Sequence, residues 1–333
     1  MSNLILTEEQ LNRVESVLIG CAIGDALGAG YEFNPPVSSE TNIEMKGGGP
    51  FNFEPGEWTD DTAMAVIAGS AITKTQGSAA ERDCLSTETL DEIVKGWIKW
   101  AGRAKDVGAQ TSNVLETTRS LSNFLKTESI SETAFRSSHD FTIANPKSAG
   151  NGSLMRTAPI ALAFLGEPEQ LWIESKRVSN LTHFDKTASE ACQIWTAAIR
   201  HAVLTGELDV RIGFDKLSES SREYWSKVID TAESSRPEDV KHNGWVVGAL
   251  QGAWSAIHLA LNETSSHPEF FEKSVEYAVR GGYDTDTVAA IAGSLAGAAV
   301  SRNDLREDWR SSLFGYGANR EHGLIILARD LVS

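Results

Sequence analysis

Apolar residues recur at helical spacing along most of the chain, and this periodicity constrains the fold more than any other feature. After a capping-box pattern at Thr7 and Gln10, they follow at intervals of three and four over residues 11–22. Sustained alternation of apolar and polar residues is absent, so nothing favours a sheet or a doubly wound fold. Further helices are predicted over approximately residues 60–75, 88–102, 110–126, 154–165, 168–181, 186–205, 243–261, 268–279, 286–300 and 319–332.

Glycines in the first predicted helix indicate how it packs. Gly20, Gly24 and Gly28 are four residues apart and therefore share one helix face, where another helix can approach closely. Their spacing is not the Gly-x-Gly-x-x-Gly turn of a dinucleotide-binding fold. Residues 30–57 and 143–153 contain too many glycines and prolines for a helix, and we predict that both are long loops with a functional role.

Length and composition fit one globular unit. The 333 residues are 41% hydrophobic and 23% charged, and no Pro-rich linker, low-complexity tract or fixed repeat divides them. We therefore predict a single all-α domain, a compact multi-helix unit, over residues 1–333. The net charge of −16 argues against sequence-independent binding of nucleic acid, which needs a basic face.

The same composition bears on location. No apolar run approaches the ~20 residues that span a bilayer, and the N-terminus lacks the basic start of a signal peptide. Three widely spaced cysteines, Cys21, Cys84 and Cys192, indicate neither a zinc site nor a disulfide framework. The expectation is a cytoplasmic protein without a membrane partner.

Two pairs of aspartates stand at predicted helix starts. Asp60 and Asp61 lie at the start of the predicted helix over residues 60–75, and Asp284 and Asp286 lie at the start of the one over residues 286–300. Capping explains one carboxylate at a helix N-terminus, but a second one beside it adds repulsion between like charges. Two such pairs suggest a cation site, and hard oxygen ligands suit Mg²⁺, Mn²⁺ or Ca²⁺ rather than zinc. From spacing alone, metal binding and capping both remain open.

The aspartate pairs belong to an ordered series of motifs that extends over about 270 residues. Its members are residues 20–28 (GCAIGDALG) followed by Glu32, residues 58–62 (WTDDT), 150–156 (GNGSLMR), 182–185 (THFD), 243–250 (NGWVVGAL) and 281–287 (GGYDTDT). Together these motifs resemble the ADP-ribosylglycohydrolase family, which includes the dinitrogenase reductase-activating glycohydrolases. The resemblance implies an all-α fold of the orthogonal multi-helix type of that family.

The resemblance also implies a site. It implies two divalent cations, Mg²⁺ foremost with Mn²⁺ as the alternative, and a loop that cradles the ligand. Glu32, Asp61 and Asp284 would be the catalytic carboxylates. The implied metal ligands are Thr59, Asp60, Asp61, Asp284, Asp286 and Thr287. The implied substrate-binding residues are Asp25, Gly150, Asn151, Gly152, Ser153, His183 and Tyr283.

The implied reaction is hydrolysis of the bond between C1 of the distal ribose of ADP-ribose and an acceptor. The substrate would be an ADP-ribosylated protein or small molecule, and ADP-ribose the product; neither the acceptor linkage nor the oligomeric state follows from the sequence. One alternative is a non-catalytic ADP-ribose-binding or structural member of the same fold. Another is a phosphatase or nuclease that uses the same two ions.

Several of these residues also have structural interpretations. Asp25 is equally compatible with a buried acid paired within the helix, and His183 with a hydrogen-bonded core residue. The loop over residues 150–153 can bind an anion through its backbone N–H groups or simply cap the next helix. Arg156 has no assigned role.

Overall fold

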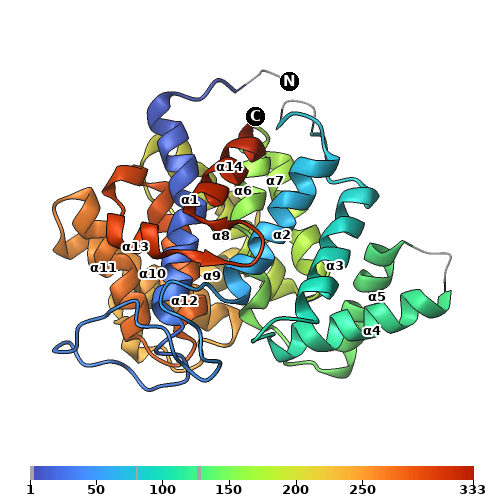
Figure 1. Ribbon diagram of the computed structural model, residues 1–333, viewed down its shortest axis with the longest axis horizontal. Helices are drawn as coiled ribbons and strands as arrows, with labels where there is room; N and C mark the ends of the chain where they lie inside the picture. Colours follow the sequence, from blue (N-terminus) through green and yellow to red (C-terminus); the bar gives the residue numbers. More distant parts are fainter. Residues whose placement is uncertain (1–3, 80–81, 126–128) are drawn as a thin grey trace.

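Helices make up most of the computed structural model, which describes residues 4–79, 82–125 and 129–333 (Figure 1). This confirms the all-α fold class. The only strands among these residues, β1 (Phe314–Gly315) and β2 (Asn319–Arg320), form a short antiparallel ribbon in which Phe314 pairs with Arg320. The α-helices are α1 (Glu8–Gly28), α2 (Asp60–Thr75), α3 (Thr87–Ala101), α4 (Ala109–Leu125), α5 (Ile130–Ala144), α6 (Ala158–Ala163), α7 (Pro168–Asn180), α8 (Lys186–Thr205), α9 (Glu219–Ser234), α10 (Val246–Glu263), α11 (His267–Arg280), α12 (Thr285–Ala298), α13 (Glu307–Ser312) and α14 (Glu321–Val332).

Each helix predicted from periodicity is present, although residue 126 of one prediction lies outside the described residues. The capping box at Thr7 and Gln10 is also present, and it starts α1. The segment predicted as helical over residues 154–165 is helical only in α6 (Ala158–Ala163). The loop predicted over residues 30–57 contains turns and isolated bridges but no helix. Within residues 143–153, the loop is shorter than expected, because α5 ends at Ala144 and a 3₁₀ turn covers residues 151–153.

Glycines allow α1 and α12 to lie side by side, although they are far apart in the sequence (Figure 1). A Cβ atom at Gly24 would lie 1.9 Å from the carbonyl oxygen of Ala289, and one at Gly20 would lie 2.3 Å from that of Gly293. A Cβ atom at Gly28 would come similarly close to the backbone of Asp286. These contacts confirm the predicted close approach of a second helix, and they place the second aspartate pair against the end of α1.

The end of α1 also holds the start of α2. Both carboxylate oxygens of Asp25 accept hydrogen bonds from the α2 N-terminus, from Thr59 N at 2.8 Å and from Thr62 N at 2.9 Å. On the other side, Thr285 Oγ1 donates to the carbonyl of Gly28 at 2.8 Å. Three helices therefore meet at one point, and the N-termini of two of them, α2 and α12, lie there.

The domain count stays a prediction, that of one unit over residues 1–333. In the part of the chain that the structure describes, we find no helix that combines the length and the apolar character needed to cross a bilayer.

Candidate active site

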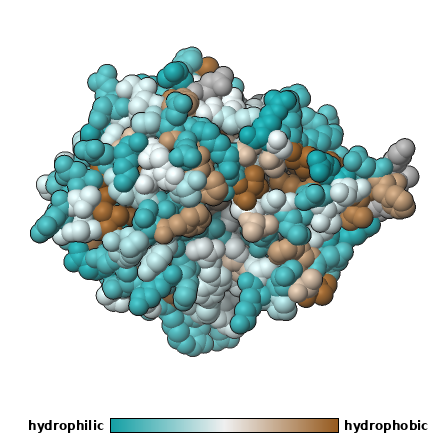
Figure 2. All heavy atoms as spheres, turned by 60° about the horizontal axis from the view of Figure 1, so that its bottom comes forward, coloured by the Kyte–Doolittle hydropathy of each residue, from teal (hydrophilic) through white to brown (hydrophobic). Residues whose placement is uncertain are grey.

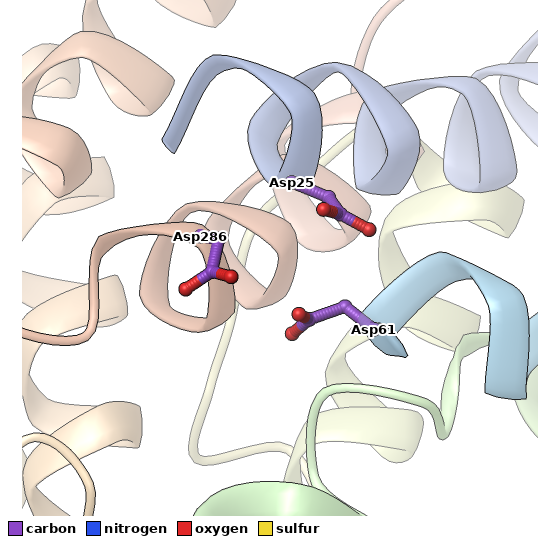
Figure 3. Close-up of side chains that lie close together, drawn as sticks. All are labelled: Asp25, Asp61 and Asp286. Carbon is purple, nitrogen blue, oxygen red and sulfur yellow. The ribbon is translucent and has the colours of Figure 1, made fainter. Parts of the chain in front are cut away.

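Carboxylates from three helices point toward one another where α1, α2 and α12 meet (Figure 3). Asp25, Asp61 and Asp286 each place one oxygen within 4.8 Å of the others. Thr59 lies between the two aspartate pairs: its hydroxyl oxygen is 2.9 Å from Asp61 Oδ2 and 3.4 Å from Asp286 Oδ2. The two pairs, which more than 220 residues separate in the sequence, thus form one cluster.

Two further groups of carboxylates share Asp286 with this first group. Glu32, Asp284 and Asp286 form one of them, and Asp60, Asp106 and Asp286 form the other, again with one oxygen of each residue within 4.8 Å of the others. We refer to the seven residues as the acidic cluster: Asp25, Glu32, Asp60, Asp61, Asp106, Asp284 and Asp286.

Burial strongly opposes ionisation in the acidic cluster. It raises the pKa of Asp60, Asp61 and Asp286 well above the usual range, and neighbouring carboxylates raise it further. Burial, followed by the charges of Asp106 and Asp284, raises the pKa of Glu32 to about 9. The pKa values of Asp25 and Asp106 rise to about 6, in both cases chiefly through burial.

No salt bridge in the described structure neutralises the cluster, although the buried Arg156 lies close enough to Asp60 for their charges to interact. Among the described residues, no Lys, Arg or His forms a salt bridge with any of its carboxylates. Within the part of the chain that the structure describes, the buried oxygens Glu32 Oε2 and Asp61 Oδ1 have no hydrogen-bond partner. Buried carboxylates are normally paired or bound to metal, so these residues fit a site for divalent cations.

A cavity of about 290 Å³, which we call the central cavity, opens onto the cluster. Its wall includes acidic and hydroxyl residues as well as residues of the predicted ligand loop: Glu32, Asp60, Asp106, Asp284, Asp286, Thr287, Gly150, Asn151, Gly152 and His183. A cavity of about 500 Å³ adjoins it at Asp60 and Asp106, and one of about 1010 Å³ adjoins it at Gly150 and Asp284. The acidic cluster therefore lies between two larger cavities. We call the one of about 500 Å³ the α3-side cavity and the one of about 1010 Å³ the Trp245-side cavity.

Hydrogen bonds connect the loop over residues 150–153, the predicted ligand cradle, to the aspartate pair Asp284 and Asp286. Asn151 Nδ2 donates to Asp284 Oδ2 at 2.7 Å and to the carbonyl of Asn243 at 2.9 Å. Asn243 in turn donates to the carbonyl of Gly282 at 2.8 Å and accepts from Asp284 N at 3.2 Å. Gly150 and Gly152 lie against His183, so the structure brings these predicted substrate-binding residues to one wall.

Two other predicted substrate-binding residues, Ser153 and Asp25, are buried away from the cavity surface. Ser153 is buried and accepts a hydrogen bond from Ser179 Oγ at 2.9 Å. Asp25 is fully buried, and its two oxygens hold the start of α2. Neither residue lines the cavity. Their predicted role in substrate binding remains untested, and their burial favours structural or metal-binding roles instead.

Glu32 lies at the start of the predicted loop over residues 30–57. It is 5% exposed and follows α1 directly, in a turn whose backbone is bonded to the Tyr283 loop: Phe33 N donates to the carbonyl of Tyr283 at 2.6 Å, and Tyr283 N donates to that of Asn34 at 2.7 Å. Tyr283 has a φ of 61° and lines the Trp245-side cavity. Glu32 is therefore held in a fixed place beside Asp284.

Sequence reasoning missed Asp106 and Asn243 as site residues. Asp106 precedes α4, belongs to the acidic cluster, and lines both the α3-side cavity and the cavity of about 290 Å³. A lone acid before a helix is also what a simple cap looks like, so the sequence carried no distinct signal for it. Asn243 lies within a quoted motif, but its bonds to Gly282 and Asp284 depend on the tertiary fold.

The face seen in Figure 2 is mostly hydrophilic or intermediate, with apolar side chains in scattered groups rather than one continuous patch. This face gives no sign of a large apolar docking surface.

Comparisons with known proteins agree with the motifs. The sequence model of the ADP-ribosylglycohydrolase family matches residues 6–333. The chain is 31% identical over 310 residues to the ADP-ribosylarginine hydrolase Tri1 of Pseudomonas putida (strain GB-1), covering 91% of this chain and 75% of that protein. It is 27% identical to the ADP-ribosyl-[dinitrogen reductase] glycohydrolase of Rhodospirillum rubrum (91% and 90%) and 26% identical to the human ADP-ribosylhydrolase ARH3 (92% and 90%). A solved structure described as an ADP-ribosylglycohydrolase-related protein complex superposes with a TM-score of 0.72 at 26% identity, covering 98% of this chain and 99% of that one.

Proposed function

Because the chain belongs to the ADP-ribosylglycohydrolase family, we propose that it hydrolyses the glycosidic bond between ADP-ribose and an acceptor, with two divalent cations in the acidic cluster. One observation carries the proposal: seven carboxylates from distant parts of the chain converge in one cluster, five of them line one cavity, and none forms a salt bridge with a basic side chain in the described structure. Such an arrangement costs stability unless cations neutralise it.

The donor set favours Mg²⁺ or Mn²⁺, since it consists of carboxylate and hydroxyl oxygens. Thr59, Asp60, Asp61, Asp284, Asp286 and Thr287 would hold the two ions, and Asp25 and Asp106 lie close enough to contribute. When bound, such ions supply positive charge that orients the ribose hydroxyls and activates water. They also offset, for an anionic ligand, the net charge of −16.

Glu32 is the best candidate for the proton-transferring group. With its pKa raised to about 9 in the metal-free protein, its carboxyl holds a proton at neutral pH, and its Oε2 atom has no protein partner. Protonation of the leaving group by such a carboxyl and attack by water on an oxocarbenium-like state form the usual route of glycoside hydrolysis. Asp106, which lines the same cavity and has a pKa of about 6, is a second carboxylate within reach of the acceptor.

The two flanking cavities would take the two ends of the substrate. The Trp245-side cavity offers Trp245, with 44% of its surface exposed, and Tyr283 for stacking of the adenine. Lys147 and Lys241 line the same cavity and would offset the charge of the pyrophosphate. The acceptor would then lie in the α3-side cavity, on the far side of the cluster.

Arginine is the acceptor to test first. The relative with 31% identity is named an ADP-ribosylarginine hydrolase. In this chain, a guanidinium in the α3-side cavity would find Asp106 as a charge partner and Trp58 and Trp100 as aromatic surfaces.

A panel of substrates tests the proposal. Arginine-linked and serine-linked ADP-ribosylated proteins and an unrelated phosphoester are each incubated with the protein and Mg²⁺, with and without EDTA, and released ADP-ribose or phosphate is measured. We expect ADP-ribose release from the arginine-linked protein alone, abolished by EDTA. Binding of ADP-ribose without release from either protein would favour the non-catalytic alternative, and release of phosphate would favour the phosphatase.

A further inference from the structure

Arg156 is a fully buried arginine without a carboxylate partner in the described chain. Its guanidinium lies 4.0 Å above the ring of Trp97, and Nη1 lies 3.7 Å from Met64 Sδ. Among the described residues, its one hydrogen bond to oxygen runs from Nη2 to Thr182 Oγ1 at 2.6 Å, and Nε has no partner. Burial lowers the pKa of Arg156 to about 9, so the side chain is still charged at neutral pH. A cation this costly to bury calls for a role other than ion pairing.

The hydroxyl of Thr182 connects Arg156 to His183. Thr182 is fully buried, and Oγ1 lies 2.7 Å from His183 Nδ1. Arginine can only donate, so Oγ1 accepts from Arg156. The single hydroxyl hydrogen of Thr182 then needs an acceptor, and the only one bonded to it in the described chain is His183 Nδ1.

This order of donors leaves one protonation state for His183. If Nδ1 accepts from Thr182, the hydrogen of the neutral ring resides on Nε2. A positively charged ring would carry hydrogens on both nitrogens, leave the Thr182 hydrogen without an acceptor, and face Arg156. We propose that Arg156 and Thr182 act as positioning residues that fix His183 as the Nε2–H tautomer, so that it can only donate a hydrogen bond to the ligand.

Nε2 is directed to the place where a ligand would lie. His183 lines the central cavity, and no group of the described residues forms a hydrogen bond with Nε2. A Cβ atom at Gly150 or Gly152 would lie 3.3 Å from Nε2, so the absence of side chains there keeps the approach open. The acceptor would be an oxygen of the ligand, a phosphate oxygen or a ribose hydroxyl; this part of the inference rests on the proposed function.

Nitrogen NMR of protein labelled with ¹⁵N-histidine tests the tautomer directly, in the metal-free and the Mg²⁺-loaded protein. The signals of His183 are assigned by their loss in His183→Asn. We expect Nε2 to carry the hydrogen and Nδ1 to show the shift of an unprotonated acceptor nitrogen. A hydrogen on Nδ1, or on both nitrogens at neutral pH, would overturn the inference. The result does not depend on any ligand, so it stands even if the protein fails to bind ADP-ribose, which would instead count against the proposed function.

Variants of Thr182 test the consequence for binding. Thr182→Val keeps the shape but removes the hydroxyl, and we expect a mixed tautomer and ADP-ribose affinity lower by about tenfold, the value of one lost hydrogen bond. Thr182→Ser keeps the hydroxyl and should restore both the tautomer and the affinity. Thr118→Val, at a buried threonine of α4 whose hydroxyl bonds only to its own helix, is the matched control and should change neither. Equal losses in the Val and Ser variants, or unchanged affinity and tautomer in Thr182→Val, would contradict the inference; if Thr182→Val does not fold, the wild-type spectrum and Thr182→Ser still decide.

Discussion

At the scale of single residues, Glu32 occupies a position in which both burial and its neighbours oppose ionisation. The charges of Asp106, Asp284, Asp60 and Asp25 add to the effect of burial, in that order. A carboxyl that stays protonated at neutral pH suits a general acid.

The variant Glu32→Gln separates proton transfer from metal binding. It keeps the size and most of the hydrogen-bonding capacity of the side chain, so we expect metal and ADP-ribose binding to persist while turnover falls by about 10²–10⁴. Single-turnover kinetics beside a metal titration measures both quantities. Glu40→Gln, at an exposed glutamate of the same loop, is the control and should behave like the wild type. Unchanged turnover in Glu32→Gln would end the catalytic assignment, and loss of metal together with activity would make Glu32 a metal ligand.

The variant Gly152→Val tests whether residues 150–153 cradle the ligand. A Cβ atom there would lie 3.1 Å from His183 Cε1 and 3.3 Å from Thr111 Oγ1, so Gly152→Val should displace His183 and fill part of the cavity. We expect weaker ADP-ribose binding by calorimetry, with the melting temperature little changed because the clash is local. Gly166→Val, at an exposed glycine whose added Cβ would meet nothing closer than 3.7 Å, should bind normally. ADP-ribose affinity unchanged in Gly152→Val would dismiss residues 150–153 as a cradle.

At the scale of elements, the contact between α1 and α12 determines the geometry of the site. Gly24 lies one residue before Asp25, and the backbone it touches belongs to α12, the helix that carries Asp286 in its first turn. Any separation of the two helices therefore moves both carboxylates.

Gly24→Ala is expected to disturb fold and site together. The new Cβ atom would lie 1.9 Å from a backbone oxygen, and backbone cannot rotate away as a side chain can. We expect a loss of stability of about 1–3 kcal/mol, the usual cost of overpacking, with weaker metal binding. Denaturant unfolding of this variant beside Gly102→Ala, whose added Cβ would meet nothing closer than 3.7 Å, measures the difference. Equal stability of the two variants would show that the glycine face has no such role.

The helices that the sequence revealed are those with a broad apolar face. Helix α9 buries only Ser221, Trp225, Ile229 and Ala232, and most of its other residues are polar, so its apolar face is too narrow to stand out in the sequence. Helix α5 buries mainly small and hydroxyl-bearing residues and was missed for the same reason. Both begin at serine caps, Ser218 and Ser129, which were the available signal.

The aspartate pairs could be predicted because their helix starts are local features, and the family motifs supported them. Their convergence could not, because it depends on how α1 packs against α12 and how Asp25 holds α2. For the same reason, Asp106 was recognisable as a site residue only in three dimensions.

At the scale of the whole molecule, the acidic cluster makes stability depend on pH and metal. The pKa of Glu32 rises to about 9 and those of Asp25 and Asp106 to about 6, whereas such groups titrate near pH 4 in an unfolded chain. The metal-free folded state therefore binds protons more tightly than the unfolded state. This contribution to stability is complete below about pH 4 and is lost as the pH rises toward 9.

Melting temperatures from pH 5 to 9 test this. In EDTA, deprotonation of the acidic cluster should lower the melting temperature as the pH rises across this range. Saturating Mg²⁺ should stabilise the protein increasingly as the pH rises, because cations bind the deprotonated carboxylates. At a metal concentration 100 times its dissociation constant the gain is about 2.7 kcal/mol. The same slope against pH with and without metal would contradict the electrostatic description of the site.

The most direct test of the central claim is the rate of ADP-ribose release from an arginine-linked ADP-ribosylated protein, followed as EDTA-treated protein is titrated with Mg²⁺ or Mn²⁺. Wild-type protein should show no release without metal and saturable recovery with it. Asp286→Asn should show little recovery at any metal concentration, because Asp286 belongs to all three groups of the cluster. Full activity in EDTA, or a normal metal response in Asp286→Asn, would contradict the claim that the acidic cluster is a metal-dependent hydrolytic centre.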